Sequence, residues 1–523
     1  METLGTSGPL SRQRKLLVIG CVLALSLAVL LVFLLVGCGG STELSPVFPP
    51  ASSSLLTVAD VQTVVQNAAQ AASPTAMVIA VVDRAGRVLA VYRKPAAPIS
   101  FNGNFGALVN TNDLAVALAR SAAFFSNDQA PLSSRTVRYI SGIHFPPGVS
   151  NAPNAALYGI ENTNRGCPLT SNFLPGQSVP TSRNLDGSPG LGIITGKANI
   201  LDSDSNAVNP GGVPLFKNGK LAGGIGVTGV STEVAEFTAF SAAVASGFGP
   251  SPASPGVVVI DGVSLPFVNQ TTLPPGTGPG VFDGSFLVGP LKSEGPPPDG
   301  DLIAPTVGVI GGLTVTEVKL VLDNAENTAN TTRAAIRLPL SARTRMVIAV
   351  ADLNGSIIGL RRMADSTVFS IDVAVAKARN MIYFNSASRT PMDLPGIPKG
   401  TAITNRTISF GSQPLFPPGI NGSEAGPFFN LYKIDLANPC TQGFDPATAN
   451  QNGIVFFPGS VPLYRSGVLV GGLGVSGDGV DQDDFVSSGG AAGFEAPASI
   501  RADQISVGSV RLPYLKFPRN PTD

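Results

Sequence analysis

Tryptophan is absent from this sequence of 523 residues, and histidine occurs only once. Charged residues make up 13% of the chain, and the formal net charge is +0. Neither a G-x-S-x-G nor an H-E-x-x-H motif occurs. The balanced charge provides no broad basic field for nucleic acid. These shortages argue against a nucleic-acid-binding protein and against the hydrolases that those two motifs mark.

Glycine and proline are abundant, with 60 and 45 residues respectively. This composition is typical of a loop-rich protein that contains β-structure. The chain is too long for one ordinary hydrophobic core, and two domains of about 200 residues each fit the usual size range.

A glycine-rich stretch occurs twice, at Val213 to Gly229 and at Val461 to Gly477. Each copy has two short apolar runs joined by a polar turn that contains glycine, which predicts a β-hairpin. Other segments recur on both sides in the same order: TVADV at Thr57 with TVTEV at Thr314, MVIAVVD at Met77 with MVIAVAD at Met346, DLAVALAR at Asp113 with DVAVAKAR at Asp372, and FPPG at Phe145 and Phe416. We therefore predict two homologous domains in tandem.

Each half reads as helix, β-hairpin, helix and then the glycine-rich hairpin, which predicts an α+β fold. The predicted first helices begin after the capping residues Thr57 and Thr314, and the second helices begin at Asp113 and Asp372, where the aspartates suit an N-cap. A further helix is expected over Thr232 to Ala245. Predicted domain boundaries are 55–270 and 307–518.

Two further features accompany each predicted domain, and a third lies between the domains. A connection of roughly 80 residues, containing FPPG and one cysteine, separates the second helix from the hairpin, and connections this long usually carry function or form an interface. The runs Val257 to Val268 and Gln504 to Leu515 are expected to add one strand to each domain. The Pro- and Gly-rich segment 271–306 is predicted to be an interdomain linker.

The N-terminus predicts export. Three basic residues precede the apolar run Leu16 to Val36, which ends in Leu-Val-Gly-Cys at Cys38. Residues 1–38 are read either as a lipoprotein signal peptide with Cys38 lipidated or as an uncleaved membrane anchor. Residues 39–54 are then a tether. Gly39 after the cysteine favours the outer membrane or cell surface of a bacterial envelope.

The combined motifs resemble the GlcG/HbpS-like haem-binding family, also called the haem-degrading domain family. The second half is the better match, with Lys377-Ala378-Arg379 and Gly474-Val475-Ser476-Gly477 followed by Gln482-Asp483. The first half has Leu118-Ala119-Arg120 and Thr228 at the corresponding positions. The resemblance implies two tandem copies of an antiparallel sheet of about five strands with flanking helices. It also implies haem as the ligand.

Candidate haem contacts follow from this resemblance. His144 is the only histidine, and imidazole is the commonest protein ligand of haem iron. Its alternative role is that of a loop histidine, since Leu415 stands at the matched position. Arg120 and Arg379 are matched basic residues that could hold a propionate or, alternatively, serve as helix-end charges or in structural ion pairs.

Both hairpins also satisfy G-x-G-x-x-G, through Gly226 and Gly229 in the first half and Gly474 and Gly477 in the second. A dinucleotide site needs this motif after the first strand of a parallel unit, whereas a hairpin precedes it here. Exposed amides at these glycines could bind an anion. Close packing of a strand against a helix is the competing explanation.

Cys167 and Cys440 occupy equivalent positions after the two FPPG motifs. They predict either an interdomain disulfide across a pseudo-twofold axis or two buried thiols. The aspartate clusters at 202–206 and 478–484 resemble calcium loops only in part, so no metal site is predicted.

We therefore expect an exported, membrane-anchored binding protein for haem or a related tetrapyrrole. The alternative is a structural or interaction scaffold of the cell envelope without a cofactor, acting as a homo-oligomer or with an envelope protein partner. No catalytic residue is predicted, because one histidine cannot give both domains the same acid–base chemistry.

Overall fold

The structure, a computed structural model, describes residues 54–523 except 170–181, 203–209, 251–255, 388 and 445–449. The predicted leader 1–38 with its candidate lipidation site Cys38 lies outside the described residues, as does the tether up to residue 53. Among the residues that are described, no helix combines the length and apolar character needed to cross a bilayer.

Each half is built on a five-stranded antiparallel sheet, and the two sheets have equivalent strand orders. The first runs β5–β6–β1–β2–β9 and the second β13–β14–β11–β12–β10. The strands of the first sheet are β1 (Val78–Asp83), β2 (Val88–Arg93), β5 (Gly212–Lys217), β6 (Lys220–Thr228) and β9 (Ser285–Val288). Those of the second are β10 (Gly300–Ile303), β11 (Val347–Ala351), β12 (Ile357–Arg362), β13 (Ser460–Arg465) and β14 (Val468–Ser476). The predicted α+β class and strand number are confirmed.

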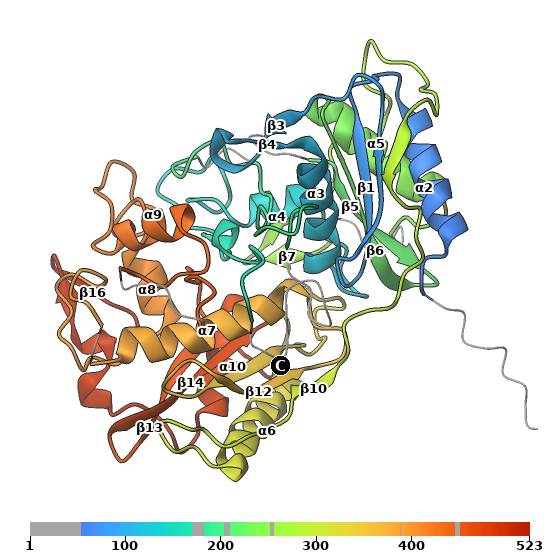
Figure 1. The fold of residues 1–523 in the computed structure, drawn as a ribbon. Helices are drawn as coiled ribbons and strands as arrows, with labels where there is room; N and C mark the ends of the chain where they lie inside the picture. Colours follow the sequence, from blue (N-terminus) through green and yellow to red (C-terminus); the bar gives the residue numbers. More distant parts are fainter. Residues whose placement is uncertain (1–53, 170–181, 203–209, 251–255, 388, 445–449) are drawn as a thin grey trace, which may run out of the picture. The chain divides into compact units, whose positions relative to one another are not determined.

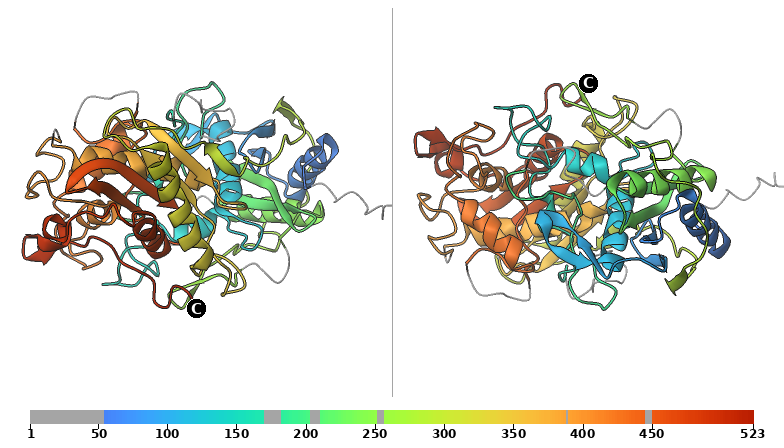
Figure 2. Two further views of the ribbon diagram at one scale, coloured as in Figure 1. Left: turned by 90° about the horizontal axis from the view of Figure 1, so that it is seen from below. Right: turned by 90° about the horizontal axis from the view of Figure 1, so that it is seen from above.

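Helices cover both faces of each sheet, as Figure 1 shows for each half. On β1, Ile79 and Val81 face α2 (Val58–Ala71) and α5 (Thr232–Ala245), whereas Ala80 and Val82 face α3 (Thr111–Phe125). This alternation follows from the two-residue period of a strand. In the second half, α6 (Val315–Thr331) and α10 (Val480–Gly490) lie on one face and α7 (Phe369–Asn385) on the other. Two further views show the same layers (Figure 2).

The duplicated hairpins form as predicted. Between β5 and β6, Asn218 and Gly219 have φ of 55° and 72°. Between β13 and β14, Ser466 and Gly467 have φ of 49° and 79°. Two consecutive positive φ values are typical of the tight turns whose twist matches that of the flanking strands.

The predicted helix starts were right in one pair and wrong in the other. Thr57 and Thr314 cap α2 and α6 in complete capping boxes, with Asp60 and Glu317 as the partners at the third helical position. Asp113 and Asp372 are not N-caps. Asn110 caps α3, and α7 begins after Val368 without a side-chain cap.

The segment predicted as a linker contributes structure to both halves. Ser285–Val288 pairs with β2 as an edge strand of the first sheet, and Gly300–Ile303 pairs with β12 at the edge of the second. Short apolar stretches within the Pro- and Gly-rich segment provide these strands, which local composition concealed.

The two runs that were expected to add a strand to each domain form separate hairpins. The run 257–268 forms a small hairpin, β7 (Val259–Ile260) with β8 (Val263–Ser264), and 504–515 forms β15 (Ser506–Val507) with β16 (Val510–Arg511). Each is a separate two-stranded sheet. A two-residue turn between these short apolar pairs lets them pair with each other instead of joining the main sheet.

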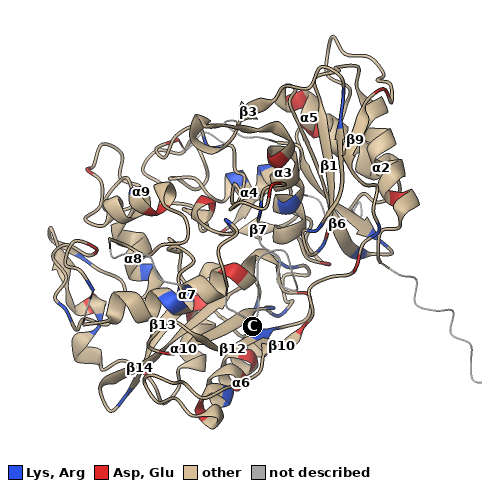
Figure 3. Ribbon diagram, viewed as in Figure 1, with Lys and Arg blue, Asp and Glu red and all other residues tan. Residues whose placement is uncertain are grey.

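The two halves share one core. The inner faces of both sheets, α3 and α7 contribute to a single apolar cluster in which Phe125 stacks on Phe369 with ring centroids 4.2 Å apart. Separate clusters lie between each sheet and its other pair of helices. Lysine and arginine are interspersed with aspartate and glutamate along the described chain (Figure 3). The halves therefore share an apolar core, and polar contacts such as the ion pair between Arg84 and Asp365 also join them.

Candidate functional site

The long connections of the two halves meet each other at matched positions. Asn151 and Asn421 exchange hydrogen bonds, because the backbone N of each donates to Oδ1 of the other at 2.8 and 2.9 Å. Tyr158 stacks on Tyr432 at 5.1 Å, and Asn162 donates to Asp435 at 2.8 Å. Contacts between equivalent residues are the mark of a twofold relationship. The two connections therefore pair as the subunits of a symmetric dimer do.

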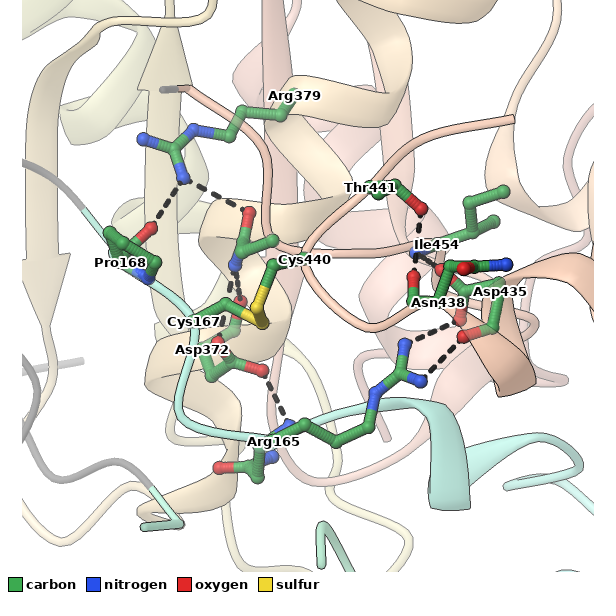
Figure 4. Close-up of a disulfide and its surroundings, with 12 residues drawn as sticks. Arg165, Cys167, Pro168, Asp372, Arg379, Asp435, Asn438, Cys440, Thr441 and Ile454 are labelled. Atoms are coloured by element: carbon green, nitrogen blue, oxygen red, sulfur yellow. Dashed lines mark hydrogen bonds and ion pairs between the residues drawn. A yellow bond between two sulfur atoms is a disulfide. The ribbon is translucent and has the colours of Figure 1, made fainter. Parts of the chain in front are cut away.

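A disulfide between Cys167 and Cys440 closes this junction, with Cα atoms 5.2 Å apart (Figure 4). Of the two alternatives left open by the sequence, the structure contains the bond. Structural disulfides persist in oxidising compartments. The bond is therefore consistent with a location outside the cytoplasm.

An ion pair buried beside the disulfide crosses the same junction. Arg165 donates to Asp435 at 2.7 Å, and Ile454 donates its backbone N to the same carboxylate (Figure 4). Burial raises the pKa of Asp435 to about 6, although Arg165 and the hydrogen bonds oppose the shift. The desolvation of this carboxylate is thus only partly compensated by its partners.

A second buried pair lies next to the first. Lys197 donates to Glu161 Oε1 at 2.8 Å, and Thr195 donates to the same oxygen at 2.9 Å. Burial lowers the pKa of Lys197, and its pairing with Glu161 opposes that shift. The other carboxylate oxygen, Oε2 of Glu161, is buried and has no hydrogen-bond partner among the described residues.

A cavity of about 360 Å³ opens beside these pairs, lined by residues of both halves. Glu161 and Arg165 line it, together with an apolar set: Phe105, Val109, Leu191, Ile194, Leu436 and Pro439. Its volume lies at the lower end of the range for small-molecule sites, and an apolar lining with a few polar groups is typical of them. None of the described residues that line it is a histidine, cysteine, methionine or tyrosine.

The twofold relationship between the two halves is not exact. Asp372 on α7 accepts a hydrogen bond from the backbone N of Asn164, in the other half, at 2.7 Å. Its counterpart Asp113 on α3 instead accepts from Leu185, in its own half, at 2.8 Å. Leu436 and Pro439 of the second half line the cavity together with residues of the first half. The two matched aspartates thus accept hydrogen bonds from different partners, one in the other half and one in the same half.

The matched arginines Arg120 and Arg379 are both buried. Arg120 donates from Nε to the backbone O of Gly86 at 2.8 Å, and Arg379 does the same to Gly355 at 3.0 Å. Arg379 also donates to the backbone O of Pro168 in the other half (Figure 4). Burial lowers the pKa of each arginine to about 10. In this structure the pair tie the helix to the hairpin turn, and a role in ligand binding stays a prediction.

The glycines of the G-x-G-x-x-G motifs lie at close approaches of the backbone. A Cβ at Gly226 would overlap the backbone O of Ala115 on α3, and one at Gly474 would overlap that of Ala374 on α7. Gly229 has a φ of 88° beside Ala76, and Gly477 lies against Met346. The competing explanation, packing of strand against helix, accounts for the contacts of Gly226 and Gly474, whereas Gly229 and Gly477 lie against the residues that precede β1 and β11.

His144 lies in the junction of the two connections, where its Nε2 is 3.3 Å from the backbone O of Gly419. The side chain is buried, at 5% exposure. Within the described residues no group of three or more His, Cys, Asp or Glu side chains is arranged to hold a metal ion. Of the aspartate clusters, residues 203–206 lie outside the described part, whereas Asp478 pairs with Arg337 and Asp483 with Lys377.

The family comparison addresses the second half. Residues 320–492 match the model of the haem degrading protein HbpS-like family. This HbpS-like domain runs from within α6 to the end of α10, so it contains β11 to β14 and α7. The first half lies outside the matched residues. No curated protein matches the chain.

Two solved structures are similar to part of the chain. One is the Klebsiella pneumoniae protein ORFY, with 19% identity over 35% of this chain and 90% of that one, and a TM-score of 0.23. The other is the PduOC:heme complex, with 20% identity over 35% of this chain and 96% of that one, and a TM-score of 0.23.

Sequence reasoning missed the residues that build the junction. Tyr158, Glu161, Arg165 and Lys197 carry no motif, and their partners lie in the other connection or far along the same one. The available signal was the matched position of the two cysteines, which would bring the two connections together only if the cysteines were bonded.

Proposed function

We propose that this chain is a non-catalytic binding protein of the cell envelope, built from two tandem copies of an HbpS-like domain, with haem or a related tetrapyrrole as its ligand. The observation that carries the proposal is the family match over residues 320–492. The equivalent strand order of the first sheet supports a second copy. The disulfide supports export, and the N-terminal segment would supply the membrane anchor.

The described residues set limits on how haem would be held. Among the described residues that line the cavity at the junction, none carries an imidazole, thiol, thioether or phenol for the iron. The cavity therefore does not fit an iron-ligated haem. His144 remains the only imidazole, and its burial in the junction requires local opening before it reaches a ligand.

Titration of haemin into the soluble body, residues 41–523, tests the proposal. Saturable growth of the Soret band near one or two equivalents is expected. A His144→Ala variant tests iron ligation, with Asn154→Ala as a neighbouring control that removes a half-buried polar side chain from the same loop. Loss of the Soret shift in His144→Ala alone makes His144 the ligand, and retention assigns binding to other groups.

The paired connections favour a second candidate function, a cofactor-free scaffold. A tandem chain whose equivalent loops contact each other resembles a dimer fused into one polypeptide, and its outer surface is then available to an envelope partner. Absence of any saturable Soret change would reject haem and leave this function. Incorporation of a lipid label that Cys38→Ala abolishes tests the anchor independently.

A further inference from the structure

We propose that Lys377 and Asp483 condense with each other, so that an amide bond between Lys377 Nζ and Asp483 Cγ joins α7 to α10 in the mature protein. The modification goes beyond the function proposed above and does not depend on it, because it requires neither haem nor a partner.

The two side chains meet in the interior of the second half. Lys377 is 0% exposed and Asp483 is 2% exposed, and Lys377 Nζ lies 3.0 Å from Asp483 Oδ2. Nζ also donates to the backbone O of Val475 at 2.8 Å, and the ring centroid of Phe457 lies 5.0 Å from it. A Cβ at Gly459 would overlap Nζ, so the backbone packs directly on the pair. The amine and the carboxyl are therefore held in contact and shielded from water.

Burial favours the neutral forms of both groups. It lowers the pKa of the Lys377 amine and raises the pKa of the Asp483 carboxyl to about 7, although the pairing of the two groups opposes both shifts. Asp483 Oδ1 is buried and has no hydrogen-bond partner among the described residues. The neighbouring carboxylate of Asp484 is paired with Arg406. Transfer of one proton within the pair thus gives a free amine beside a carboxylic acid, the two reactants of amide formation.

The condensation balances without a further reactant. The lone pair of Nζ forms a bond to Cγ, and the bond between Cγ and Oδ2 breaks. Oδ2 leaves as water with the acid proton and one amine proton, while the other amine proton stays on the amide nitrogen. Groups held in contact react with effective molarities of about 10⁵ M or more, which exceeds the concentration of the bulk water that drives hydrolysis.

The first half shows that the fold does not require this ion pair. Leu118 occupies the position of Lys377 in the matched sequences Leu-Ala-Arg and Lys-Ala-Arg. Ala235 occupies the position of Asp483, since each lies against the glycine that precedes the edge strand of its sheet. A buried ion pair is often no more stabilising than an apolar pair of similar volume. The presence of an amine and a carboxyl at this place in the second half therefore points to a reaction between them.

The bond would join the two helical layers of the second half. α7 and α10 lie on opposite faces of the sheet, and the two residues are 106 positions apart in the sequence. A cross-link over such a span restricts the unfolded chain, as a disulfide does. Unlike a disulfide, an amide is not broken by reductant.

Mass spectrometry of tryptic peptides from the full chain, digested after unfolding and reduction, tests the proposal. Trypsin does not cleave after an acylated lysine, so the bond should yield residues 363–379 joined to residues 466–501. The mass of the product should be the sum of the two peptides less one molecule of water. The separate peptides 363–377 and 466–501 should be almost absent.

Two variants provide the controls. The double variant Lys377→Leu/Asp483→Ala reproduces the pair found in the first half, so it should fold and yield only separate peptides. Lys319→Met, at an exposed lysine on α6, should yield the joined product as the wild type does.

Separate peptides at full mass from the folded wild-type protein overturn the proposal, and this result requires no variant to fold. A loss of water that maps to one linear peptide overturns it as well. A joined product that contains Lys197 and Glu161 in place of Lys377 and Asp483 would assign the reaction to the other pair and overturn this one.

Discussion

Phe125, the last residue of α3, stacks on Phe369, the first residue of α7, with ring centroids 4.2 Å apart and planes 13° apart. Both rings are almost fully buried, at 0% and 2% exposure. The backbone N of Val368 also donates to the backbone O of Phe124 at 3.0 Å. The end of a helix in one half therefore packs directly on the start of the matched helix in the other.

Because this stack lies in the shared core, Phe125→Ala should destabilise the protein by about 3 to 5 kcal/mol, the usual cost of removing a buried phenylalanine. Both halves should lose stability together. Urea unfolding gives the size of the effect, and hydrogen exchange of peptides from β6 and β14 shows whether it reaches both sheets. Phe517→Ala, at a residue with 47% exposure, should cost far less. Loss of protection in β6 alone would show that the halves fold independently.

The disulfide predicts that reductant lowers the free energy of unfolding of the protein. Joining Cys167 to Cys440 spans a sequence separation of 273 residues, and its removal should cost about 2 to 4 kcal/mol of unfolding free energy. A Cys167→Ser/Cys440→Ser double variant should match the reduced wild-type protein and should itself be insensitive to reductant. If the midpoint of urea unfolding in the wild-type protein is the same with and without reductant, the bond contributes nothing to stability.

The close approach of β6 to α3 predicts that Gly226→Ala is strongly destabilising. The added methyl group would meet the backbone of Ala115, which cannot move as a side chain can, so a loss of about 3 kcal/mol is expected. Gly474→Ala should behave in the same way against Ala374. Gly278→Ala is the control, since nothing lies within 4 Å of its Cβ position. Thermal unfolding of the three variants measures the difference, and equal midpoints would remove the packing explanation for the glycine motif.

The raised pKa of Asp435 predicts that the stability of the folded protein depends on pH. Its pKa is raised by burial from 3.8 to about 6, so the folded state binds its proton more tightly than the unfolded chain does. The stability it contributes is therefore fully present below the unfolded value and is lost as pH rises through about 6. Asp435→Asn should remove this loss. Between about pH 4 and pH 7, the free energy of unfolding of the variant should therefore rise relative to that of the wild type by an amount on the order of 2 kcal/mol.

Urea unfolding across that pH range measures the effect. The difference between the two proteins isolates Asp435 from the other titrating groups, even though the variant leaves Arg165 without its ionic partner at every pH. Asp299→Asn, at an exposed carboxyl, should give a curve parallel to that of the wild type. Parallel curves for Asp435→Asn as well would show that burial does not shift this carboxyl.

Local patterns were enough to place most of the regular elements. The capping residues Thr57 and Thr314, the turns at Asn218 and Ser466 and the alternation along β1 and β11 each depend on residues close in the sequence. The matched order of these elements also predicted two similar α+β halves. The edge strands β9 and β10 were missed because their pairing with β2 and β12, and not their composition, makes them strands.

The candidate site depends on contacts that no local pattern encodes. Glu161 and Lys197 lie in one connection, whereas Arg165 finds Asp435 in the other. The sequence identified Cys167 and Cys440 as equivalent and left their bonding open, because bonding depends on the distance between two loops. His144, Arg120 and Arg379 were selected as chemically suitable side chains, but their burial is a property of the packing around them.

What the sequence by itself determined is therefore the duplication, the class of the fold and the types of its elements, since periodicity, caps and turns act over a few residues. Only the tertiary structure decided that the halves share a core, that their connections pair at equivalent positions, and that the matched Asp113 and Asp372 find different partners. Those outcomes depend on which apolar surfaces pack together and are removed from water, and that packing involves segments that are far apart in the sequence.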